Sequence, residues 1–423
     1  MPSCAIEPGC PVARYDVVVV GAGPGGAEAA RAAAGRGLRT LLLEEHHSVG
    51  LPTHCTGKLS LHAFREFDLP RTLAINALSA AVFHSPGGVA VHVRRPSADS
   101  YVVDRVLFDR WLVARAARVG AEVLTGVRVT DAQHRGGWLR VDGSYAGQPG
   151  TFQAEARTVI DAEGASPRLP AALGLRLVRT WANGLQYEMQ GVGGLEPDTP
   201  EMFFGRAIAP GFFAWLLPVG RDRARVGLAV DPRETVHAPI YFLERLLAAH
   251  PALHRRMAGA AVVRKVAGRI PMLAGRAPTS RGGMLVVGDA AGQVKATSGG
   301  GIYFAMIAGR LAGTAAARYA AGDRRAAEAY ERGWRRAFGR EVAFTALGRR
   351  VINRLADREL DLVMRFIHAN PGVRASVEAD GDTQYQSRIY IPLLRTLAAA
   401  ALRRPVLLPV VGQALVHGML VQM

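Results

Sequence analysis

A glycine-rich turn between two apolar segments constrains the fold of this chain more than any other feature. Asp16–Val20 (DVVVV) leads straight into Gly21–Gly26 (GAGPGG), an alanine-rich helix follows, and Leu41–Glu44 (LLLE) comes next. In such a turn the first glycine lets the chain turn tightly, the second lets the backbone approach a pyrophosphate, and the third lets helix and strand pack closely. Glu44 ends the second strand, where a carboxylate can accept hydrogen bonds from ribose hydroxyls. This order predicts a site for the ADP half of a dinucleotide, and an ordinary βαβ unit is the weaker alternative.

A second glycine-bearing segment indicates which dinucleotide. Leu285–Gly292 (LVVGDAAG) places Asp289 just after an apolar strand, and Gly299–Gly301 follows a few residues later. An aspartate in this position can hold a ribitol hydroxyl, and the next helix start can face the pyrophosphate or the flavin carbonyls. The segment favours FAD over NAD, and predicts that FAD stretches across one domain built from distant parts of the chain.

These segments, with a third one between them, resemble motifs of the FAD-dependent family of the aromatic hydroxylase and reductase fold. The third is Asp161–Ser166 (DAEGAS), where Glu163 stands in place of the usual aspartate and the serine comes one residue early. The segment DRVLFD, with Arg105 and Asp109, resembles the family's helix beneath the cofactor. The resemblance implies that Arg105 helps to fix FAD; a surface pair on a helix is the alternative.

Within this fold, residues 15–370 are most similar to the geranylgeranyl reductase family. Gly288–Tyr303 (GDAAGQVKATSGGGIY) resembles the family's extended signature, with Ala296 where proline is common. Val49–Gly57 (VGLPTHCTG) resembles its cysteine-glycine loop near the flavin ring. Phe213–Gly220 (FAWLLPVG) resembles its aromatic Tyr-x-Trp-x-Phe-Pro element, although phenylalanine and leucine replace the tyrosine and the second aromatic residue.

The resemblance implies an FAD-dependent reductase that hydrogenates isolated double bonds of a polyprenyl, geranylgeranyl-type chain. The chain would be carried on a lipid, a quinone, a chlorophyll precursor or a diphosphate. Beside the flavin, the Cys55 thiol can donate a proton or order a water molecule, although a small buried residue is the plainer interpretation. His54 is a candidate proton relay or a solvent-facing loop residue. Lys295, and less clearly Lys58, is a candidate partner for the flavin or for a substrate phosphate.

The predicted site residues follow from these motifs. The catalytic candidates are Cys55, His54 and Lys295. The predicted cofactor-binding residues are Gly21, Gly23, Gly26, Glu44, Glu45, Cys55, Arg105, Glu163, Gly164, Gly288, Asp289, Gly292, Gly299, Gly300 and Gly301. The predicted substrate-binding residues, which would line a long apolar pocket, are Phe213, Trp215, Pro218 and Tyr303. No metal site is predicted.

Two other classes of function remain open from the sequence. One is a flavin-dependent monooxygenase or halogenase of the same fold. A halogenase would favour a second tryptophan in the Phe213–Pro218 element, and that second tryptophan is missing. The other is a non-catalytic flavin-binding or membrane-adaptor protein, because one scaffold hosts many functions. The reductant is also open: no second dinucleotide fingerprint occurs, so NAD(P)H could react transiently or ferredoxin could act as an electron-donor protein.

The predicted fold class is α/β. It comprises a discontinuous Rossmann-like FAD-binding domain (residues 1–70, 100–174 and 275–322), a substrate-binding antiparallel β domain (71–99 and 175–274) and a helical C-terminal region (323–423). Short apolar runs separated by turns indicate the β domain. The helix expected over 103–119 has Asp104 placed to cap its start.

Composition bears on partners and location. The formal net charge is +17, and only three of the 52 basic residues are lysines. The arginines are dispersed rather than grouped beside aromatic residues, which argues against nucleic acid and favours anionic lipid or a diphosphate. Three cysteines and no apparent secretory signal predict a cytoplasmic protein. The apolar stretches 389–402 and 405–421 predict either peripheral contact with the inner face of the cell membrane or helices packed on their own domain.

Overall fold

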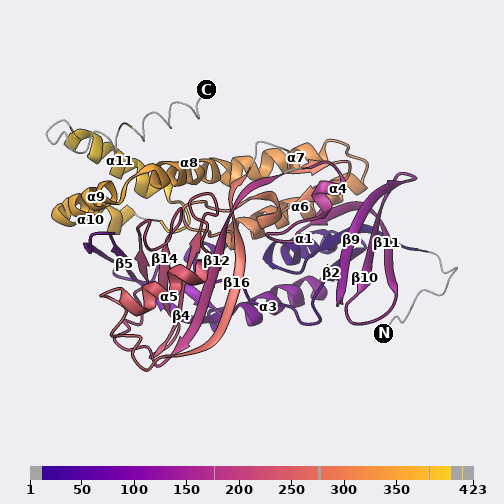
Figure 1. Cartoon of the computed structure of the whole chain (residues 1–423). Coiled ribbons are helices and arrows are strands. Elements are labelled where there is room, and N and C mark those ends of the chain that lie inside the picture. The colour runs from indigo at the N-terminus through magenta and orange to yellow at the C-terminus, as the bar shows by residue number, and fades with distance from the viewer. Residues whose placement is uncertain (1–11, 176, 275–277, 381, 402–411, 413–423) are drawn as a thin grey trace.

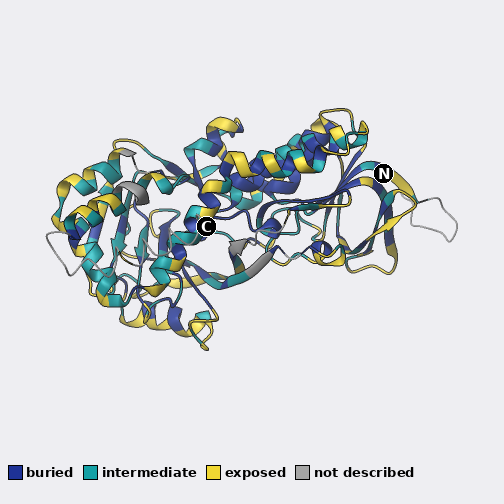
Figure 2. Ribbon diagram, turned by 90° about the horizontal axis from the view of Figure 1, so that it is seen from above, coloured by how far each residue is buried: buried dark blue, intermediate teal, exposed yellow. Residues whose placement is uncertain are grey.

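The computed structural model describes residues 12–175, 177–274, 278–380, 382–401 and 412. Two β-sheets lie toward opposite ends of the molecule, and the helices of the C-terminal region run along one side across both (Figure 1). The strands are largely buried, and the exposed residues concentrate on the outer faces of the helices and on loops (Figure 2). The α/β fold class and the helical C-terminal region are confirmed, whereas the residue boundaries of the three parts remain a prediction.

The first sheet brings the two glycine segments to one edge. Its strands are β1 (Ala13–Val20), β2 (Thr40–Glu44), β8 (Glu122–Thr125), β9 (Val127–Arg135), β10 (Trp138–Tyr145), β11 (Thr151–Asp161), β17 (Ser280–Arg281) and β18 (Met284–Val286). Strands β8, β2, β1, β11 and β18 are adjacent and parallel in that order, with β17 antiparallel to β18 and the β9–β10 pair extending from β11. Because they are parallel, their carboxyl ends share the edge where such sheets bind ligands.

Three helices cover one face of this sheet: α1 (Pro24–Ala34), α3 (Arg105–Arg118) and α6 (Ile302–Ala320). Small residues let α1 and α6 touch at backbone distance: a Cβ added to Gly309 would lie 2.1 Å from the Gly25 carbonyl oxygen. The start of α3 is capped as predicted, because the Asp104 carboxylate accepts the amide hydrogens of Val106 and Leu107 at 2.8 and 3.1 Å. Two shorter elements are α4 (Leu169–Ala172) and the 3-10 turn η2 (Gly288–Ala291).

The second sheet has seven strands. In spatial order they are β16 (Ala261–Ala274), β12 (Val178–Gln190), β15 (Arg223–Val230), β14 (Ala214–Pro218), β13 (Glu201–Phe203), β5 (Ala80–His84) and β6 (Ala90–Arg94). All neighbours are antiparallel except β13 and β5. Helix α5 (Pro239–Ala249) packs its buried side chains on one face, which leaves the other face for a cavity. The predicted β insertion is confirmed.

A small sheet links the two parts. It contains β3 (Lys58–Ser60), β7 (Ser100–Val103) and β4 (Ala74–Leu78), with α2 (Leu61–Glu66) and the short turn η1 (Arg71–Leu73) between them in sequence. Because β3 follows the cysteine-bearing loop directly, this sheet fixes where that loop ends.

The C-terminal region is a run of helices. They are α7 (Ala326–Trp334), a π-helical turn (Arg335–Gly339), α8 (Arg340–Arg354), α9 (Asp357–Ala369), α10 (Pro371–Asp380) and α11 (Ser387–Ala401). Helix α11 holds the first of the two apolar stretches, and its Leu397 packs with Phe366 of α9. Among the described residues, no helix combines the length and apolarity needed to cross a bilayer. The stretch 405–421 lies outside the described residues except for residue 412.

Candidate active site

One cavity of about 1120 Å³ joins the two parts of the molecule. It extends from the carboxyl edge of the parallel strands, past the cysteine-bearing loop and the triple-glycine turn, to the open face of the second sheet and the C-terminal helices. Its wall includes most of the predicted site residues: Gly21, Gly23, Glu44, Glu45, His54, Cys55, Arg105, Glu163, Gly164, Phe213, Trp215, Gly288, Asp289, Lys295, Gly299, Gly300, Gly301 and Tyr303. Gly26, Gly292 and Pro218 are not part of the wall.

The first glycine segment has the geometry of a nucleotide cradle. A Cβ on Gly21, which has φ +101°, would lie 2.3 Å from the Ala162 carbonyl oxygen, and one on Gly26 would lie 1.8 Å from the Gly21 carbonyl oxygen. These two glycines therefore serve close backbone packing, which explains why Gly26 is not exposed to the cavity. A Cβ on Gly23 would meet nothing within 4 Å, so the start of α1 is open to the cavity. The arrangement fits a pyrophosphate.

Glu44 lies beside this cradle at the end of β2. Its carboxylate accepts the Ala22 amide hydrogen at 3.0 Å and the His46 amide hydrogen at 3.0 Å, which fixes its orientation. The His46 ring nitrogen Nδ1 also lies 2.7 Å from the oxygen that accepts the His46 amide, so the other carboxylate oxygen is the one that keeps a lone pair for a ribose hydroxyl. Glu45, which also lines the cavity, is half exposed and forms an ion pair with Arg128 at 2.9 Å.

In the middle motif, Glu163 and Gly164 line the cavity, and the Glu163 carboxylate also bonds to the backbone. One Glu163 oxygen accepts the backbone amides of Arg168 and Leu169 at 2.7 and 3.0 Å, so this carboxylate helps to order the turn before α4. Asp161 is fully buried, and one of its oxygens has no hydrogen-bond partner in the described residues. Burial, followed by the nearby Glu163, raises the pKa of Asp161 well above its ordinary value. Gly164 has φ +82° and would carry a Cβ without a clash, so its backbone is open to the cavity.

Asp289 and the triple-glycine turn define the next part of the wall. Burial raises the pKa of Asp289 to about 6, partly offset by Arg105. A Cβ on Gly301 would lie 2.9 Å from an Asp289 carboxylate oxygen, so a larger residue there would displace this carboxylate. Gly292 closes the preceding turn in the left-handed conformation, with φ +67°. A buried carboxylate with a raised pKa, beside a helix start, fits a ligand that donates hydroxyl hydrogen bonds such as the ribitol of FAD.

Arg105 joins the cofactor region to the cysteine. Its guanidinium pairs with Asp109 at 2.8 Å, and both side chains are largely buried, which excludes a surface pair. Burial alone would lower the pKa of Arg105, but the Asp109 carboxylate and the Cys55 sulfur beside it hold that pKa above its ordinary value. Arg105 therefore provides a positive charge that acts on both Asp289 and Cys55.

The Cys55 sulfur faces the cavity and accepts hydrogen bonds. The Gly57 amide donates to it at 3.3 Å, and Arg105 interacts with it electrostatically. A second guanidinium, that of buried Arg225 on β15, donates to the Thr56 carbonyl at 2.6 Å and holds the loop from the opposite side. His54 is exposed and borders Gly268 of β16. Sequence reasoning missed Arg225 because no local motif distinguishes it from the many other arginines.

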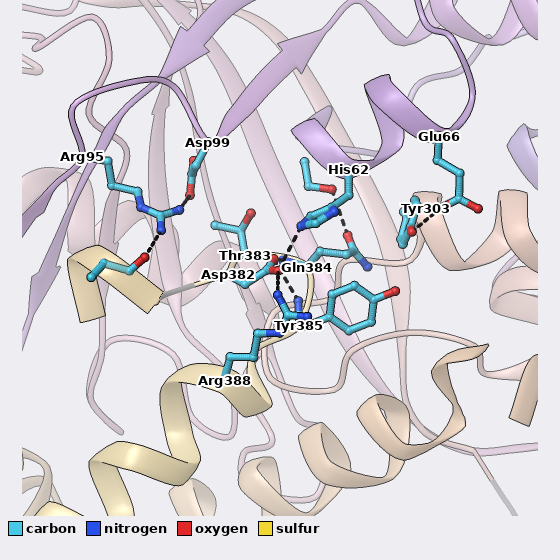
Figure 3. A network of polar contacts seen from close by, with 12 residues as sticks. His62, Glu66, Arg95, Asp99, Tyr303, Asp382, Thr383, Gln384, Tyr385 and Arg388 are labelled. Carbon is cyan, nitrogen blue, oxygen red and sulfur yellow. Dashed lines mark hydrogen bonds and ion pairs between the residues drawn. The ribbon is translucent and has the colours of Figure 1, made fainter. Parts of the chain in front are cut away.

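The turn before the three glycines is held from the C-terminal region. Arg349 of α8 is buried, donates to the carbonyls of Ala296 and Thr297 at 3.1 and 2.5 Å, and lies over the Phe212 ring at 4.4 Å. Lys295 donates to the Thr383 carbonyl at 2.7 Å. Figure 3 shows the segment around Thr383 in contact with residues of α2 and α11. Arg349 was also missed, since its partners are more than fifty residues away in the sequence.

The remaining wall is apolar. From the second sheet it includes Phe213, and Trp215, whose indole nitrogen donates to Gln186 at 3.1 Å. Pro218 is instead buried at the end of β14, where its carbonyl accepts from Asn76 at 2.8 Å. Tyr303 lines the cavity and donates its hydroxyl to Glu66 at 2.5 Å. The C-terminal helices contribute Leu347, Val351, Met364, Ile367, Leu393 and Leu397. Such a wall fits a long hydrocarbon chain that leaves water.

Comparison with known proteins identifies the family. Residues 181–270 match the model described as the geranylgeranyl reductase catalytic domain, and residues 16–172 match that of an FAD dependent oxidoreductase. A digeranylgeranylglycerophospholipid reductase of Methanocaldococcus jannaschii is 33% identical over 82% of this chain and 89% of its own length. The chain belongs to the geranylgeranyl reductase family. A digeranylgeranylglycerophospholipid reductase 2 of Methanopyrus kandleri is 34% identical, again over 82% of this chain and 89% of its own.

Membership of the geranylgeranyl reductase family confirms the prediction of an FAD-dependent oxidoreductase that reduces carbon–carbon double bonds of geranylgeranyl-type chains. A geranylgeranyl bacteriochlorophyll reductase-like protein from Thermoplasma acidophilum superposes with a TM-score of 0.81 at 24% identity, over 92% of this chain and 100% of its own. A myxobacterial chondrochloren halogenase superposes with a TM-score of 0.67 at 21% identity, over 90% of this chain and 97% of its own. At these sequence identities, both superpositions show a shared fold and do not identify the reaction.

Proposed function

We propose that this reductase acts on the geranylgeranyl chains of a glycerophospholipid, as the names of its relatives state for those proteins. The observation that carries the proposal is the continuity of the cavity, from the glycine cradle past Cys55 into a wall of apolar side chains. An uncharged prenyl chain gains free energy when that wall removes it from water, at about 25 cal/mol for each Å² of apolar surface buried. A head group would stay at the polar part of the cavity.

The residues around Cys55 support a role for its thiol in proton delivery. When bound and reduced, FAD would supply the hydride that one alkene carbon needs, and the other carbon would need a proton from the protein. The Cys55 thiol would give that proton and retain the electron pair of the S–H bond. The thiolate left behind is stabilised by the Gly57 amide and by the positive charges of Arg105 and Arg225. Exposed His54 would return a proton from solvent, which closes the cycle.

Anaerobic single-turnover reduction tests this proposal. The FAD-loaded protein is reduced, mixed with a digeranylgeranylglycerophospholipid, and followed by flavin absorbance and by lipid mass spectrometry. We expect flavin reoxidation that depends on the lipid, with two hydrogen atoms added for each bond reduced. A flavin that stays reduced with the lipid, but gives product with oxygen and an aromatic acceptor, would instead favour a monooxygenase or halogenase. Bound FAD without reoxidation by any acceptor would favour a non-catalytic role.

The electron donor and the membrane contact are part of the same proposal. NAD(P)H reacting transiently, or ferredoxin, would reduce the flavin, and anaerobic mixing with each donor distinguishes them by which one bleaches the flavin. The lipid substrate would be taken from the inner face of the cell membrane, with the net positive charge of the chain favouring anionic head groups. Co-sedimentation with vesicles of anionic and of neutral lipid tests this contact. Equal binding to both would show that the positive charge of the protein does not contribute to membrane binding.

A further inference from the structure

Two of the three lysines in this arginine-rich chain lie in the cavity wall. Lys58 begins β3, directly after the cysteine-bearing loop, and Lys295 precedes the triple-glycine turn. The third lysine, Lys265, is exposed on β16 beside the Tyr187 ring and is not part of the wall. Lysine offers a compact charge on a flexible stem, whereas most other basic positions in this chain carry arginine.

The two lysines approach the same side chain: the Gln384 side-chain oxygen accepts the hydroxyl of Ser60, on the strand that Lys58 begins, at 3.4 Å and lies 3.5 Å from the Lys295 nitrogen. A Cβ on Gly300 would lie 3.3 Å from the Lys295 nitrogen, which places this ammonium beside the glycine turn. Burial, followed by the charge of Lys58, lowers the pKa of Lys295 to about 7. Burial also lowers the pKa of Lys58, although Asp99 and Asp382 oppose that shift. Two cations that repel each other in a partly dry cavity are costly unless an anion joins them.

The neighbouring carboxylates are already engaged by other groups. One carboxylate oxygen of Asp382 lies 3.0 Å from the His62 ring nitrogen Nε2 and 3.3 Å from the Arg388 guanidinium. Asp99 accepts the Ser100 hydroxyl at 2.7 Å and lies 3.9 Å from Arg95 (Figure 3). Glu341 accepts the backbone amide and the hydroxyl of Ser387.

Lys295 does have polar contacts, but they are uncharged. It donates to the Thr383 carbonyl, and the Gln384 side-chain oxygen lies 3.5 Å from its nitrogen. Within the part of the chain that the structure describes, neither lysine has a carboxylate at ion-pairing distance, and Lys58 has no side-chain hydrogen-bond acceptor. The cavity wall therefore carries two lysine side chains beside the glycine turn, and no described carboxylate forms a direct ion pair with either of them.

We propose that Lys58 and Lys295 together bind the phosphate or diphosphate group of the substrate. The inference rests on the proposed function, because it assigns the head-group end of a prenyl substrate. A phosphate carries close to two negative charges and several strong acceptor oxygens, so it can neutralise both ammonium groups at once. With the head group beside the glycine turn, the chain would extend along the apolar wall, and its double bond nearest the head group would lie closest to Cys55.

Anion binding to the oxidised, FAD-loaded protein tests this site without turnover. Inorganic pyrophosphate is titrated and followed by calorimetry and by the flavin absorbance spectrum. Loss of one charged hydrogen-bonding partner is expected to weaken pyrophosphate binding about tenfold to a hundredfold in Lys58→Met and in Lys295→Met. Lys265→Met is the matched control and should bind as the parent does. Circular dichroism and the FAD content of each variant establish that it is folded and loaded.

Two competition arms identify the source of the anion. Geranylgeranyl diphosphate is one competitor, and vesicles containing a digeranylgeranylglycerophospholipid are the other. Competition by either or both supports the site and names its ligand. The proposal is overturned if pyrophosphate does not bind, binds equally to the lysine variants, or is displaced by neither competitor. It is also overturned if the variants change only the flavin reduction potential, because the lysines would then serve the flavin. Since the titration involves no reduction, a failed reductase assay does not affect its outcome.

Discussion

Arg349 of the helical region holds the turn before the three glycines, so replacing it should have a large effect. Its guanidinium donates to the carbonyls of Ala296 and Thr297 and, at 3.5 Å, to that of Gly211, and the residue is 2% exposed. Hydrogen bonds from a charged donor contribute about 1.5–3 kcal/mol each, so Arg349→Met should cost about 3–6 kcal/mol of local order. Contact with the Phe212 ring adds about 1 kcal/mol. If the turn must be ordered before FAD binds, even the lower limit of about 3 kcal/mol corresponds to roughly a hundredfold weaker FAD affinity.

Reconstitution of the apoprotein measures this loss. FAD fluorescence quenching gives Kd for the parent, for Arg349→Met, and for Arg350→Met, a matched control because Arg350 is the exposed neighbour on the same helix. Arg349→Lys should recover only part of the affinity, since one ammonium lacks the planar fork that reaches both carbonyls. If Arg349→Met binds FAD within a factor of about two of the parent, the turn does not depend on this arginine and the reasoning is wrong.

Three further outcomes are expected. Cys55→Ala should still bind FAD but reduce the alkene more slowly in single turnover, because the proton donor is lost. Equal reduction rates in the variant and the parent would exclude Cys55 as the proton donor. Since burial raises the pKa of Asp289 to about 6, and its ionised form is the better acceptor, FAD affinity should rise with pH toward neutrality and then level off. Asp289→Asn should remove that dependence, so a slope retained in this variant would point to another group. Gly23→Ala should change apoprotein stability by less than about 1 kcal/mol but weaken FAD binding, because the new methyl would face the open cradle; denaturant unfolding and FAD titration decide.

Much of the cofactor region follows from sequence because local chemistry dictates it. The glycines at 21 and 26 are required by backbone contacts, and parallel strands oblige the segments after β1, β11 and β18 to meet at one edge. The same logic brings Asp289 to the cradle. These features depend on strand order and turn geometry, and both can be recognised from the residue types in the sequence.

The substrate side is less visible in the sequence because it depends on tertiary contacts. Arg225 and Arg349 act through carbonyls far away in the chain, and an arginine that does so looks like any other. Pro218 belongs to an element that resembles a family motif, yet alternation along β14 turns it away from the cavity that Trp215 lines. In the sequence, the apolar residues of α8, α9 and α11 indicate only amphipathic helices. Tertiary packing decides which face of each helix covers the cavity.

The distribution of the cavity wall has a consequence for how such an enzyme could diversify. Helices α9 and α11 lie at the end of the molecule away from the parallel sheet (Figure 1), and they contribute Met364 and Leu397 to the wall. Exchanging these side chains for larger or smaller ones would alter the room for the tail of a prenyl group while leaving the nucleotide cradle unchanged. With the tail placed as proposed, its permitted length and the redox chemistry would depend on separate stretches of polypeptide, and selection could adjust one without disturbing the other.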